Sequence, residues 1–412
     1  MLLPQPECES LLKILYLVLD TGIPVCGSKG ASAHVRALSE ALAEIGQEIT
    51  VAATDIGGSE PIAKEVQLVS ISSSDSVEAL ASTSLAHKRE LRSLFRNVDA
   101  HQSLTKLIQS IQPDVILERL SLFSIAGLAV ANASKIPYLL EVDAPLSQEA
   151  AQYRGLELQE TARLFERTLV SMADAVLPVS TALRDWAVSQ GASSQRVHII
   201  PNGVNTRQFD PALAKDKRKE LGLEGAEVVG FVGGFRPWHG INLIMKAFNL
   251  LVERNQDARL LLVGDGPARA SVDDWLKRDS LADRVLVTGH VPHTQVPDFL
   301  ATIDVVLAPY EDIPNFYFSP LKILESMAMG RPTVASAAGD IPELMMGGKA
   351  GILVPPGDAN ALATSAERLL RDTKLAAELG EAARECAVNY HDWQSVAARI
   401  VEYAHTTRGD SG

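Results

Sequence analysis

Residues 12–53, LKILYLVLDTGIPVCGSKGASAHVRALSEALAEIGQEITVAA, decide the fold class of this chain. Residues 12–19 are almost continuously apolar, which is typical of a strand that is buried on both faces. A glycine-bearing loop over residues 22–30 comes next, and the apolar spacing then predicts a helix over residues 31–45 that ends at a glycine. Residues 48–53 are predicted as the following strand. A strand–helix–strand unit implies a parallel sheet, so we expect an α/β fold.

The same alternation continues along the chain and restarts once, after a polar and charged stretch around residues 214–227. Before the restart, strands are predicted at residues 114–117, 138–142, 175–179 and 197–200. After it, strands are predicted at residues 228–233, 260–264, 285–289, 305–308 and 333–336. Helices are predicted over residues 241–254 and through most of residues 360–404.

At 412 residues, the chain is longer than a single hydrophobic core usually supports. We therefore expect two Rossmann-like, doubly wound domains, at residues 12–205 and 222–385, that face a central cleft. A C-terminal helix over residues 386–405 is expected to return toward the first domain.

The composition narrows the class of protein. Hydrophobic residues make up 46% and charged residues 22%, as in a soluble globular protein. A net charge of −13 argues against broad nucleic-acid binding, although it does not exclude a phosphate-bearing ligand. The three cysteines are far apart and lack metal-ligand spacing, and no apolar run approaches membrane-spanning length. We expect a cytoplasmic protein.

Residues 316–332, FYFSPLKILESMAMGRP, are the segment that says most about function. The pattern predicts a helix that begins near Ser319 or Pro320 and stops at Gly330. The unpaired N–H groups at the start of such a helix attract phosphate. Glu325 lies one to two turns inside, where its carboxylate can accept hydrogen bonds from ribose hydroxyls. This combination suits a sugar nucleotide, although a solvated glutamate and ordinary proline capping are the plain alternatives.

Five loops that follow predicted strands carry glycine or polar residues, at the edge of the sheet where ligands bind in doubly wound folds. The loops are residues 22–30, 233–240, 264–267, 289–291 and 308–312. In the second of them, Arg236 is the candidate partner for a diphosphate, because a guanidinium can bind two phosphate oxygens at once. His239 is a candidate second, pH-sensitive donor. A surface ion pair for Arg236 and a helix-capping role for His239 are the alternatives.

In this order, the motifs resemble those of the retaining family 4 glycosyltransferases, which have the GT-B fold. The matching segments are residues 29–32 (KGAS), 179–180 (VS), 200–204 (IPNGV), 237–240 (PWHG), 263–267 (VGDGP) and 319–330. The resemblance covers nearly the whole chain and implies that the first domain binds the acceptor and the second binds a nucleotide sugar. It also implies that Trp393 lies near the return of the chain to the first domain.

Carried over residue by residue, the resemblance implies that Glu325 holds the ribose hydroxyls. Arg236 and His239 stand in the loop that usually supplies an arginine and a lysine to the diphosphate, with His239 in place of the lysine. His290 and Val291 fall where family members touch the base, and the backbone of Pro320, Leu321 and Lys322 is the implied phosphate cradle. Pro320 has no N–H to give to this cradle. Gly30 would let the backbone of the first domain approach the donor, with a plain turn glycine as the alternative. Gly234, Gly264, Tyr317 and Ser319 are the other candidate donor-binding positions.

Two positions depart from the family pattern. Tyr317 stands where a glutamate eight residues before Glu325 usually contacts the donor sugar. Asp143 stands where the first domain usually has a donor-contacting histidine. Asp143 could contact a sugar hydroxyl or steer the acceptor, and a structural cap before Pro145 is the alternative.

A basic stretch in the first domain places Arg89, Arg92 and Arg96 on one helical face. Such a face can contact anionic lipid on the inner side of a membrane or bind a phosphorylated acceptor. A solvated helix face is the alternative.

We therefore expect a retaining hexosyltransferase that moves a sugar from a nucleoside diphosphate to a glycan or lipid-linked acceptor hydroxyl, with catalysis by Arg236, His239, Glu325 and Asp143. The nucleotide sugar would be a co-substrate, and neither a cofactor nor a metal ion is expected, because no closely spaced acidic pair suggests a metal bridge. A GT-B epimerase or phosphorylase and a non-catalytic nucleotide-sugar-binding subunit remain the alternatives.

Overall fold

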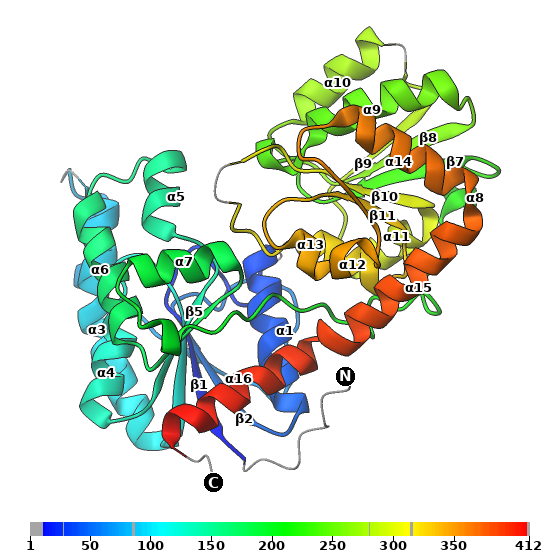
Figure 1. The fold of residues 1–412 in the computed structure, drawn as a ribbon. Helices are drawn as coiled ribbons and strands as arrows, with labels where there is room; N and C mark the ends of the chain where they lie inside the picture. The colour runs from blue at the N-terminus through cyan, green and yellow to red at the C-terminus, as the bar shows by residue number, and fades with distance from the viewer. Residues whose placement is uncertain (1–10, 28, 85–86, 280, 314–315, 410–412) are drawn as a thin grey trace. The chain divides into compact units, whose positions relative to one another are not determined.

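The computed structural model describes residues 11–27, 29–84, 87–279, 281–313 and 316–409 (Figure 1). The chain divides into two compact units. The first unit holds the described residues up to Pro201 together with those from Trp393 onward, and the second unit is Asn202–Asp392.

The first unit is built on a six-stranded sheet in which every pairing is parallel. Its strands are β1 (Lys13–Val18), β2 (Glu48–Ala53), β3 (Gln67–Ser70), β4 (Val115–Arg119), β5 (Tyr138–Val142) and β6 (Ala175–Pro178). They lie in the order β3-β2-β1-β4-β5-β6, with Leu15 of β1 opposite Thr50 on one side and Ile116 on the other.

Helices cover both faces of this sheet. They are α1 (Gly30–Glu44), α2 (Asp75–Ala79), α3 (Lys88–Ile111), α4 (Ala126–Ser134), α5 (Leu146–Tyr153), α6 (Gln159–Met172), α7 (Thr181–Ser189) and α16 (Trp393–Arg408). The helices α1 and α16 pack against each other and bury one face of the sheet, where Val35 and Val396 join the side chains of β1, β2 and β4. Because helices cover both faces, the strands are apolar almost throughout.

The second unit repeats this design. Its strands are β7 (Glu227–Val232), β8 (Ala258–Val263), β9 (Val285–Gly289), β10 (Val305–Ala308), β11 (Thr333–Ser336) and β12 (Ile352–Val354), in the parallel order β12-β11-β10-β7-β8-β9. Its helices are α8 (Arg218–Leu221), α9 (Ile241–Arg254), α10 (Arg269–Arg278), α11 (Val296–Thr302), α12 (Leu321–Ala328), α13 (Ile341–Leu344), α14 (Ala359–Arg371) and α15 (Thr373–Tyr390).

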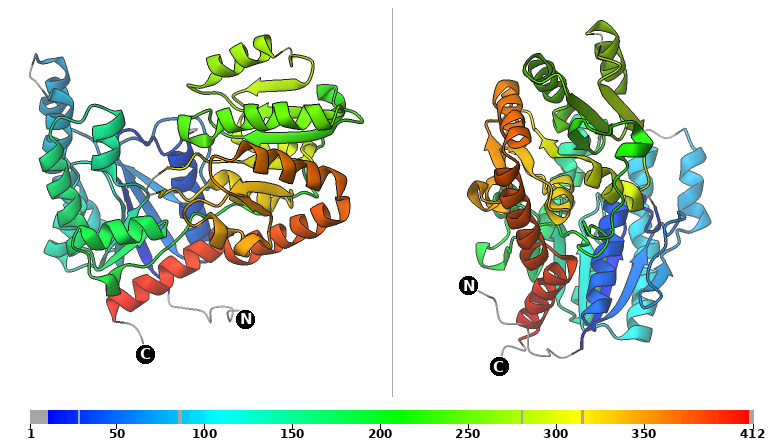
Figure 2. Two further views of the ribbon diagram at one scale, coloured as in Figure 1. Left: turned by 45° about the horizontal axis from the view of Figure 1, so that its top comes forward. Right: turned by 90° about the vertical axis from the view of Figure 1, so that its right-hand side faces the viewer.

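Successive side chains of β7 enter two different apolar cores. Val229 and Phe231 pack with α9, α10 and α14, whereas Val228 and Val232 pack with α11, α12 and α15. Figure 2 shows the resulting helix–sheet–helix layering in each unit. Because apolar helices cover both faces of the sheet, polar ligand-binding groups can gather only in the loops at the carboxyl ends of its strands.

In both sheets, the strand order reverses between the first strand and its neighbour later in the chain. The reversal lies between β1 and β4 in the first unit and between β7 and β10 in the second. At such a point the loops that leave the two carboxyl ends diverge to opposite faces, and a ligand can enter between them.

The structure differs from the sequence-based assignment in three places. Residues 197–200 form a single bridge, Val176 with Val197, rather than a strand. The edge strands β3 and β12 were not predicted, because they are short and partly exposed. The helix expected over residues 386–405 is two helices, since α15 runs to Tyr390 and α16 begins at Trp393.

The break between these helices coincides with contacts to the connector that follows Pro201. Asp392 accepts hydrogen bonds from the backbone N–H and the hydroxyl of Thr206, at 3.2 and 2.6 Å. Val204 donates its N–H to the carbonyl of His391 at 2.7 Å. The connector after Pro201 therefore pairs with residues 391–392, and this pairing interrupts the helix.

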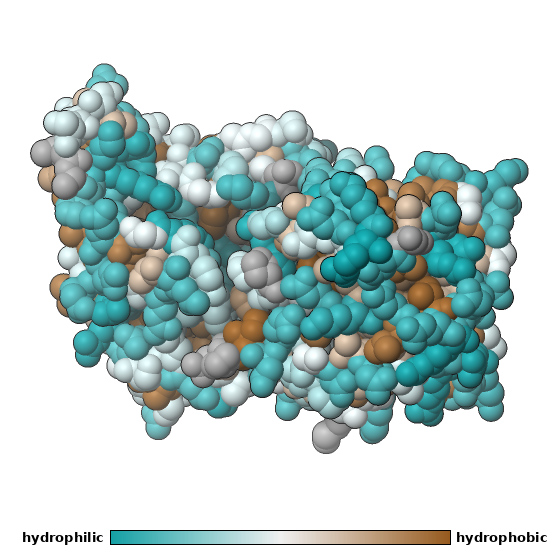
Figure 3. Space-filling model, turned by 90° about the horizontal axis from the view of Figure 1, so that it is seen from above, coloured by the Kyte–Doolittle hydropathy of each residue, from teal (hydrophilic) through white to brown (hydrophobic). Residues whose placement is uncertain are grey.

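Figure 3 shows teal, hydrophilic side chains over most of the visible face, with small and scattered brown patches. No helix in the described ranges combines the length and apolar character needed to cross a bilayer.

A buried carboxyl group in the first unit makes its stability depend on pH. Glu118 of β4 is fully buried and accepts hydrogen bonds from the hydroxyls of Tyr138 and Ser124, at 2.8 and 3.0 Å. Burial raises the pKa of Glu118 from 4.5 to about 7. Because the folded chain then holds a proton that the unfolded chain releases, the free energy of unfolding should fall as pH rises between these values.

We predict that Glu118→Gln removes most of this pH dependence and stabilises the protein at pH 8 by about 2–3 kcal/mol, because the amide needs no ionisation. Urea unfolding of both proteins between pH 5 and pH 8 measures the free energy of unfolding and its pH dependence. Glu48→Gln, at the exposed start of β2, is the control and should unfold like the wild type. A wild-type protein equally stable at both pH values would contradict the prediction.

Candidate functional site

The two loops at the reversal point of the second sheet are joined by aromatic contacts. The β7 loop is residues 233–240, and the β10 loop has residues 309–313 and 316–320 described. Trp238 of the first stacks on Phe318 of the second, with ring centroids 6.1 Å apart. These contacts hold both loops at the carboxyl edge of β7 and β10, where a doubly wound sheet places its ligand.

A third loop, after β8, touches the β7 loop through glycine backbone. Gly264 has a φ of +137°, and a Cβ atom there would lie 2.1 Å from the carbonyl oxygen of Gly233. Any side chain at position 264 would therefore push the two loops apart. The neighbouring Gly234 is exposed, which leaves its backbone accessible on the side away from this contact.

His239 is held inward by the same loop. Its Nδ1 donates a hydrogen bond to the carbonyl of Gly234 at 2.6 Å. Burial and the neighbouring charges of Lys322 and Arg236 lower the pKa of His239 to about 3. The imidazole is then neutral near pH 7 and its Nε2 carries no proton, so in the unliganded protein His239 is not the pH-sensitive donor expected from the sequence.

Lys322 is the unexpected feature of this site. Its Nζ is buried and has no hydrogen-bond partner among the described residues. It lies over the rings of Phe231 and Tyr310, 4.5 and 5.1 Å from their centroids, and a Cβ atom at Gly233 would be 3.6 Å from it. Burial lowers the pKa of Lys322 to about 7, with Glu325 acting in the opposite direction. An ammonium held this way lacks an anion.

Helix α12 begins beside this ammonium. Pro320 is its N-cap residue and no side chain caps it, so the N–H groups of Leu321 and Lys322 have no partner within the helix. Ser319 has a structural role, because its hydroxyl and carbonyl oxygens accept hydrogen bonds from the backbone N–H and side-chain amide of Asn202, both at 3.1 Å. The start of the helix is therefore fixed to the connector and left open to an anion.

Glu325 lies one turn further along α12, with its side chain 14% exposed. Its Oε1 accepts a hydrogen bond from Nε2 of His293 at 2.7 Å. The sequence reasoning missed His293, and only its place in the loop after β9, close to the predicted His290 and Val291, could have drawn attention to it. His290 is exposed and Val291 is half-buried.

Arg236 belongs to the β7 loop and Tyr317 to the β10 loop. The Arg236 side chain is exposed and makes no ion pair within the described part of the chain, so the surface ion pair considered for it is not found. Tyr317 is half-buried and its ring lies 4.4 Å from that of Phe318. Arg236, His239, Glu325 and Lys322 thus all belong to the loops and helix at one sheet edge.

The remaining predicted residues, Gly30 and Asp143, belong to the first unit. Gly30 is the exposed first residue of α1, and a Cβ atom there would meet nothing within 4 Å. Asp143 follows β5 and forms an ion pair with Nη1 of Arg119 at 2.8 Å, rather than the helix cap considered for it. Burial raises the pKa of Asp143.

Asp143 is part of a buried polar network. Donor atoms of His34, Glu141 and Asp143 lie within 4.8 Å of one another, as metal ligands would. However, Nη1 of Arg119 is 2.8 Å from Asp143 and 3.4 Å from Glu141, and the Tyr16 hydroxyl donates to Glu141 at 2.7 Å. With this cation already between the two carboxylates, the residues fit an internal charge-balanced network better than a metal site.

Comparisons with known proteins agree with this architecture. The sequence model of the family described as Glycosyltransferase Family 4 matches residues 28–208, and that of Glycosyl transferases group 1 matches residues 226–372. The alpha-D-kanosaminyltransferase of Streptomyces kanamyceticus is 31% identical over 227 residues, which cover 53% of this chain and 57% of that protein. The chain thus matches little more than half the length of this relative.

Two solved structures have the same fold. Sucrose-phosphate synthase from Thermosynechococcus elongatus superposes with a TM-score of 0.73 at 21% identity, over 97% of this chain and 100% of that one. The Anabaena protein HepE, solved in complex with UDP, gives a TM-score of 0.68 at 19% identity, over 96% of this chain and 100% of that one.

We predict that Lys322→Met stabilises the unliganded protein by about 1–3 kcal/mol near pH 6, because it removes a buried ammonium without a hydrogen-bond partner. It should also weaken binding of inorganic pyrophosphate. The pKa of Lys322 in the folded chain lies below its ordinary value of 10.5, so the stabilisation should shrink as pH rises above about 7.

Thermal unfolding at pH 6 and pH 9, and calorimetric titration with pyrophosphate, measure both effects. Lys246→Met, at an exposed position of α9, is the matched control. Equal pyrophosphate affinity in the two variants would contradict the assignment of Lys322 to an anion site.

Proposed function

The chain belongs to the group 1, family 4-like glycosyltransferases with the GT-B fold, and we propose that it is a retaining hexosyltransferase that transfers a sugar from a nucleoside diphosphate to an acceptor hydroxyl in glycan synthesis. The family resemblance and the two-domain α/β fold expected from the sequence are thereby confirmed.

The observation that carries this proposal is the unsatisfied positive charge at the reversal point of the second sheet. Lys322 has no anionic partner within hydrogen-bond reach among the residues that the structure describes, the first N–H groups of α12 have no partner within the helix, and Arg236 is exposed in the adjacent loop. A pyrophosphate group would satisfy all three. Lys322 then supplies the cation that the family usually places at the position of His239.

Glu325 suits the ribose of the same nucleotide. Its Oε1 is held by His293, and no hydrogen bond to its Oε2 is found in the described part of the chain. A carboxylate fixed at one oxygen can accept the hydroxyls of a ribose with the other, at little entropic cost. His290 and Val291, in the loop that leads to His293, would contact the base.

The nature of donor and acceptor is a further part of the proposal. HepE was solved in complexes with UDP and with UDP-glucose, and the Streptomyces relative is named a kanosaminyltransferase. We expect a nucleoside-diphosphate hexose as donor and a glycan or lipid-linked glycan as acceptor, with Tyr317 near the sugar of the donor.

The reaction breaks the bond between the anomeric carbon and the diphosphate oxygen and forms a bond from the acceptor oxygen to the same carbon, on the same face. The acceptor proton passes to the departing phosphate oxygen, so the products are a glycoside and a nucleoside diphosphate. Charge develops on the diphosphate as its bond breaks, and the preorganised donors stabilise that charge. Each such donor can lower the barrier by about 2.7–4 kcal/mol.

A non-catalytic nucleotide-sugar-binding subunit is the second candidate function. It is favoured by Tyr317 in place of the usual glutamate and by the ion pair that Arg119 makes with Asp143. Slow hydrolysis of the donor without acceptor distinguishes the two functions, since a catalyst releases nucleoside diphosphate and a binding subunit does not.

We predict that Arg236→Ala lowers release of UDP from UDP-glucose, or of the diphosphate from whichever donor binds, by about 10²–10³-fold, because it removes a donor to the leaving group. Arg278→Ala, at a side chain 72% exposed on α10, should behave as the wild type. A coupled assay for free nucleoside diphosphate measures the rate. Unchanged release in Arg236→Ala would rule out this role.

We also predict that the transferase activity survives exhaustive dialysis against EDTA. In the proposed site, protein cations and amide groups would neutralise the charge of the diphosphate. Removal of divalent ions should therefore change the rate less than about twofold. Loss of a charge-stabilising group would instead lower the rate by about 10²–10³-fold. Loss of activity that Mg²⁺ or Mn²⁺ restores would contradict this.

A further inference from the structure

The first unit contains a cavity of about 650 Å³ that the donor site does not use. It opens at the carboxyl edge of the first sheet, where Asp20 and Thr21 follow β1, Thr54 follows β2 and Phe123 follows β4. The cavity therefore occupies the reversal point between β1 and β4, equivalent to the place of the anion site in the second unit.

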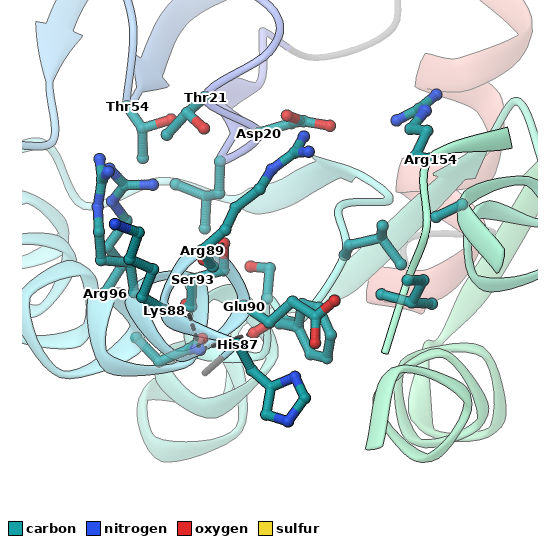
Figure 4. A pocket seen from close by; sticks show the side chains of 18 of the residues that line it. Asp20, Thr21, Thr54, His87, Lys88, Arg89, Glu90, Ser93, Arg96 and Arg154 are labelled. Atoms are coloured by element: carbon teal, nitrogen blue, oxygen red, sulfur yellow. Dashed lines mark hydrogen bonds between the residues drawn. The ribbon is translucent and has the colours of Figure 1, made fainter. Parts of the chain in front are cut away.

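Positive side chains dominate the lining. Figure 4 shows several of them around the hollow, most of them carried by α3. The lysine and arginine residues that line it are Lys88, Arg89, Arg92, Arg96 and Arg154. The three arginines predicted from the sequence to share a helical face thus all line this cavity, with Arg92 and Arg96 partly buried and Arg89 exposed.

The three carboxylates of the lining are already engaged. Glu90 accepts the backbone N–H groups of Glu157 and Leu158, both at 2.8 Å. Glu157 pairs with Nδ1 of His87 at 2.6 Å, and Asp20 accepts the N–H of Gly22 at 2.7 Å. These contacts hold the three carboxylates in place, and none of the three forms an ion pair with an arginine of the lining in the described part of the chain.

The arginines differ in what they already contact. Arg92 and Arg96 share the carboxylate of Glu78, at 2.8 and 2.9 Å, which holds them side by side, and hydrogen bonding to Arg96 lowers the pKa of Glu78. Nε of Arg92 is nevertheless buried without a hydrogen-bond partner. The guanidinium of Arg89 makes no ion pair or hydrogen bond within the described ranges. Arg154 pairs with Glu149 at 2.7 Å. Three guanidinium groups held in ion pairs, and the uncommitted one of Arg89, therefore border the cavity.

Another part of the cavity wall is apolar and is held in place by hydrogen bonds. Asn97 of α3 donates to the carbonyl of Phe123 at 2.7 Å and accepts the N–H of Ile125 at 2.8 Å. This holds Phe123 at a φ of +61°, buried in an apolar cluster with Leu156. A preformed cavity with a cationic side and an apolar side suits a ligand that presents an anion next to a carbohydrate or apolar body.

We propose that this cavity binds an anionic group of the acceptor, a phosphate or a carboxylate, with Arg89 as its principal ligand. The inference rests on the proposed function, because it assigns to the first unit the acceptor of that reaction. Guanidinium groups bind both anions through paired N–H donors, and a neutral acceptor would supply no counter-charge to Arg89 and no acceptor suited to the buried Nε of Arg92.

A flat membrane surface fits the same arginines less well. The side chains of Arg92 and Arg96 are only 26% and 15% exposed, and both are tied to Glu78. A helix that lies on lipid headgroups presents its basic side chains outward. Membrane contact through these arginines is therefore the competing explanation that the experiment below distinguishes.

Isothermal titration of the full chain with glucose 6-phosphate, glucuronate and glucose tests the proposal. The two anionic sugars distinguish phosphate from carboxylate recognition, and glucose is the neutral reference. We expect at least one anionic sugar to bind about tenfold or more tightly than glucose, and Arg89→Gln to remove about tenfold of that affinity. Lys106→Gln, an exposed position of the same helix, removes the same charge outside the cavity and should change nothing.

Equal binding of all three sugars, or equal affinity in Arg89→Gln and Lys106→Gln, would overturn the proposal. Co-sedimentation with phosphatidylglycerol vesicles that is lost in Arg89→Gln, in a protein that binds neither anionic sugar, would also overturn it. Donor hydrolysis is measured on the same variants. If Arg89→Gln hydrolyses the donor normally, failure of this inference leaves the proposed function intact.

Discussion

The parallel pairing of β7 with β10 is the constraint on which the candidate site depends. Both strands are buried on both faces, so their polar surroundings can only be at their ends. The strand order of the sheet reverses between β7 and β10. The loops that follow these two strands therefore leave toward opposite faces of the sheet, and the space between the loops stays open. The β7 loop, the β10 loop and the start of α12 meet there for this reason, and the aromatic contact between Trp238 and Phe318 holds them together.

Both units carry positive charge at the same topological position but neutralise it to different degrees. In the second unit, the ammonium of Lys322 lies over two aromatic rings and has no hydrogen-bond partner among the described residues, and burial lowers its pKa. In the first unit, Glu78 neutralises Arg92 and Arg96 in part, and Arg89 makes no ion pair within the described part of the chain. An unliganded protein that keeps such groups is less stable than it could be, which is the usual relation between binding sites and stability.

The sequence reasoning predicted most of the fold because long buried strands and amphipathic helices have strong periodic signals. The strands β1, β2, β7 and β8 and the helix α9 lie close to where they were predicted. The reasoning failed where a segment is extended without pairing, as at residues 197–200, or pairs over only a few residues, as in β3 and β12. In those segments, tertiary contacts decide whether the extended chain pairs with a neighbouring strand, and the strand propensity of the residues does not.

The sequence by itself determined two doubly wound sheets, the helix that carries Glu325, and the loops that carry Arg236 and His239, because periodicity and glycine placement are local properties of the chain. Only the tertiary structure decided that His239 contacts the carbonyl of Gly234 and has a lowered pKa, that Lys322 is buried with no hydrogen-bond partner among the described residues, and that His293 contacts Glu325. Those facts arise from burial and from contacts between residues far apart in the chain, which set pKa values and hydrogen-bond partners and leave no periodic trace.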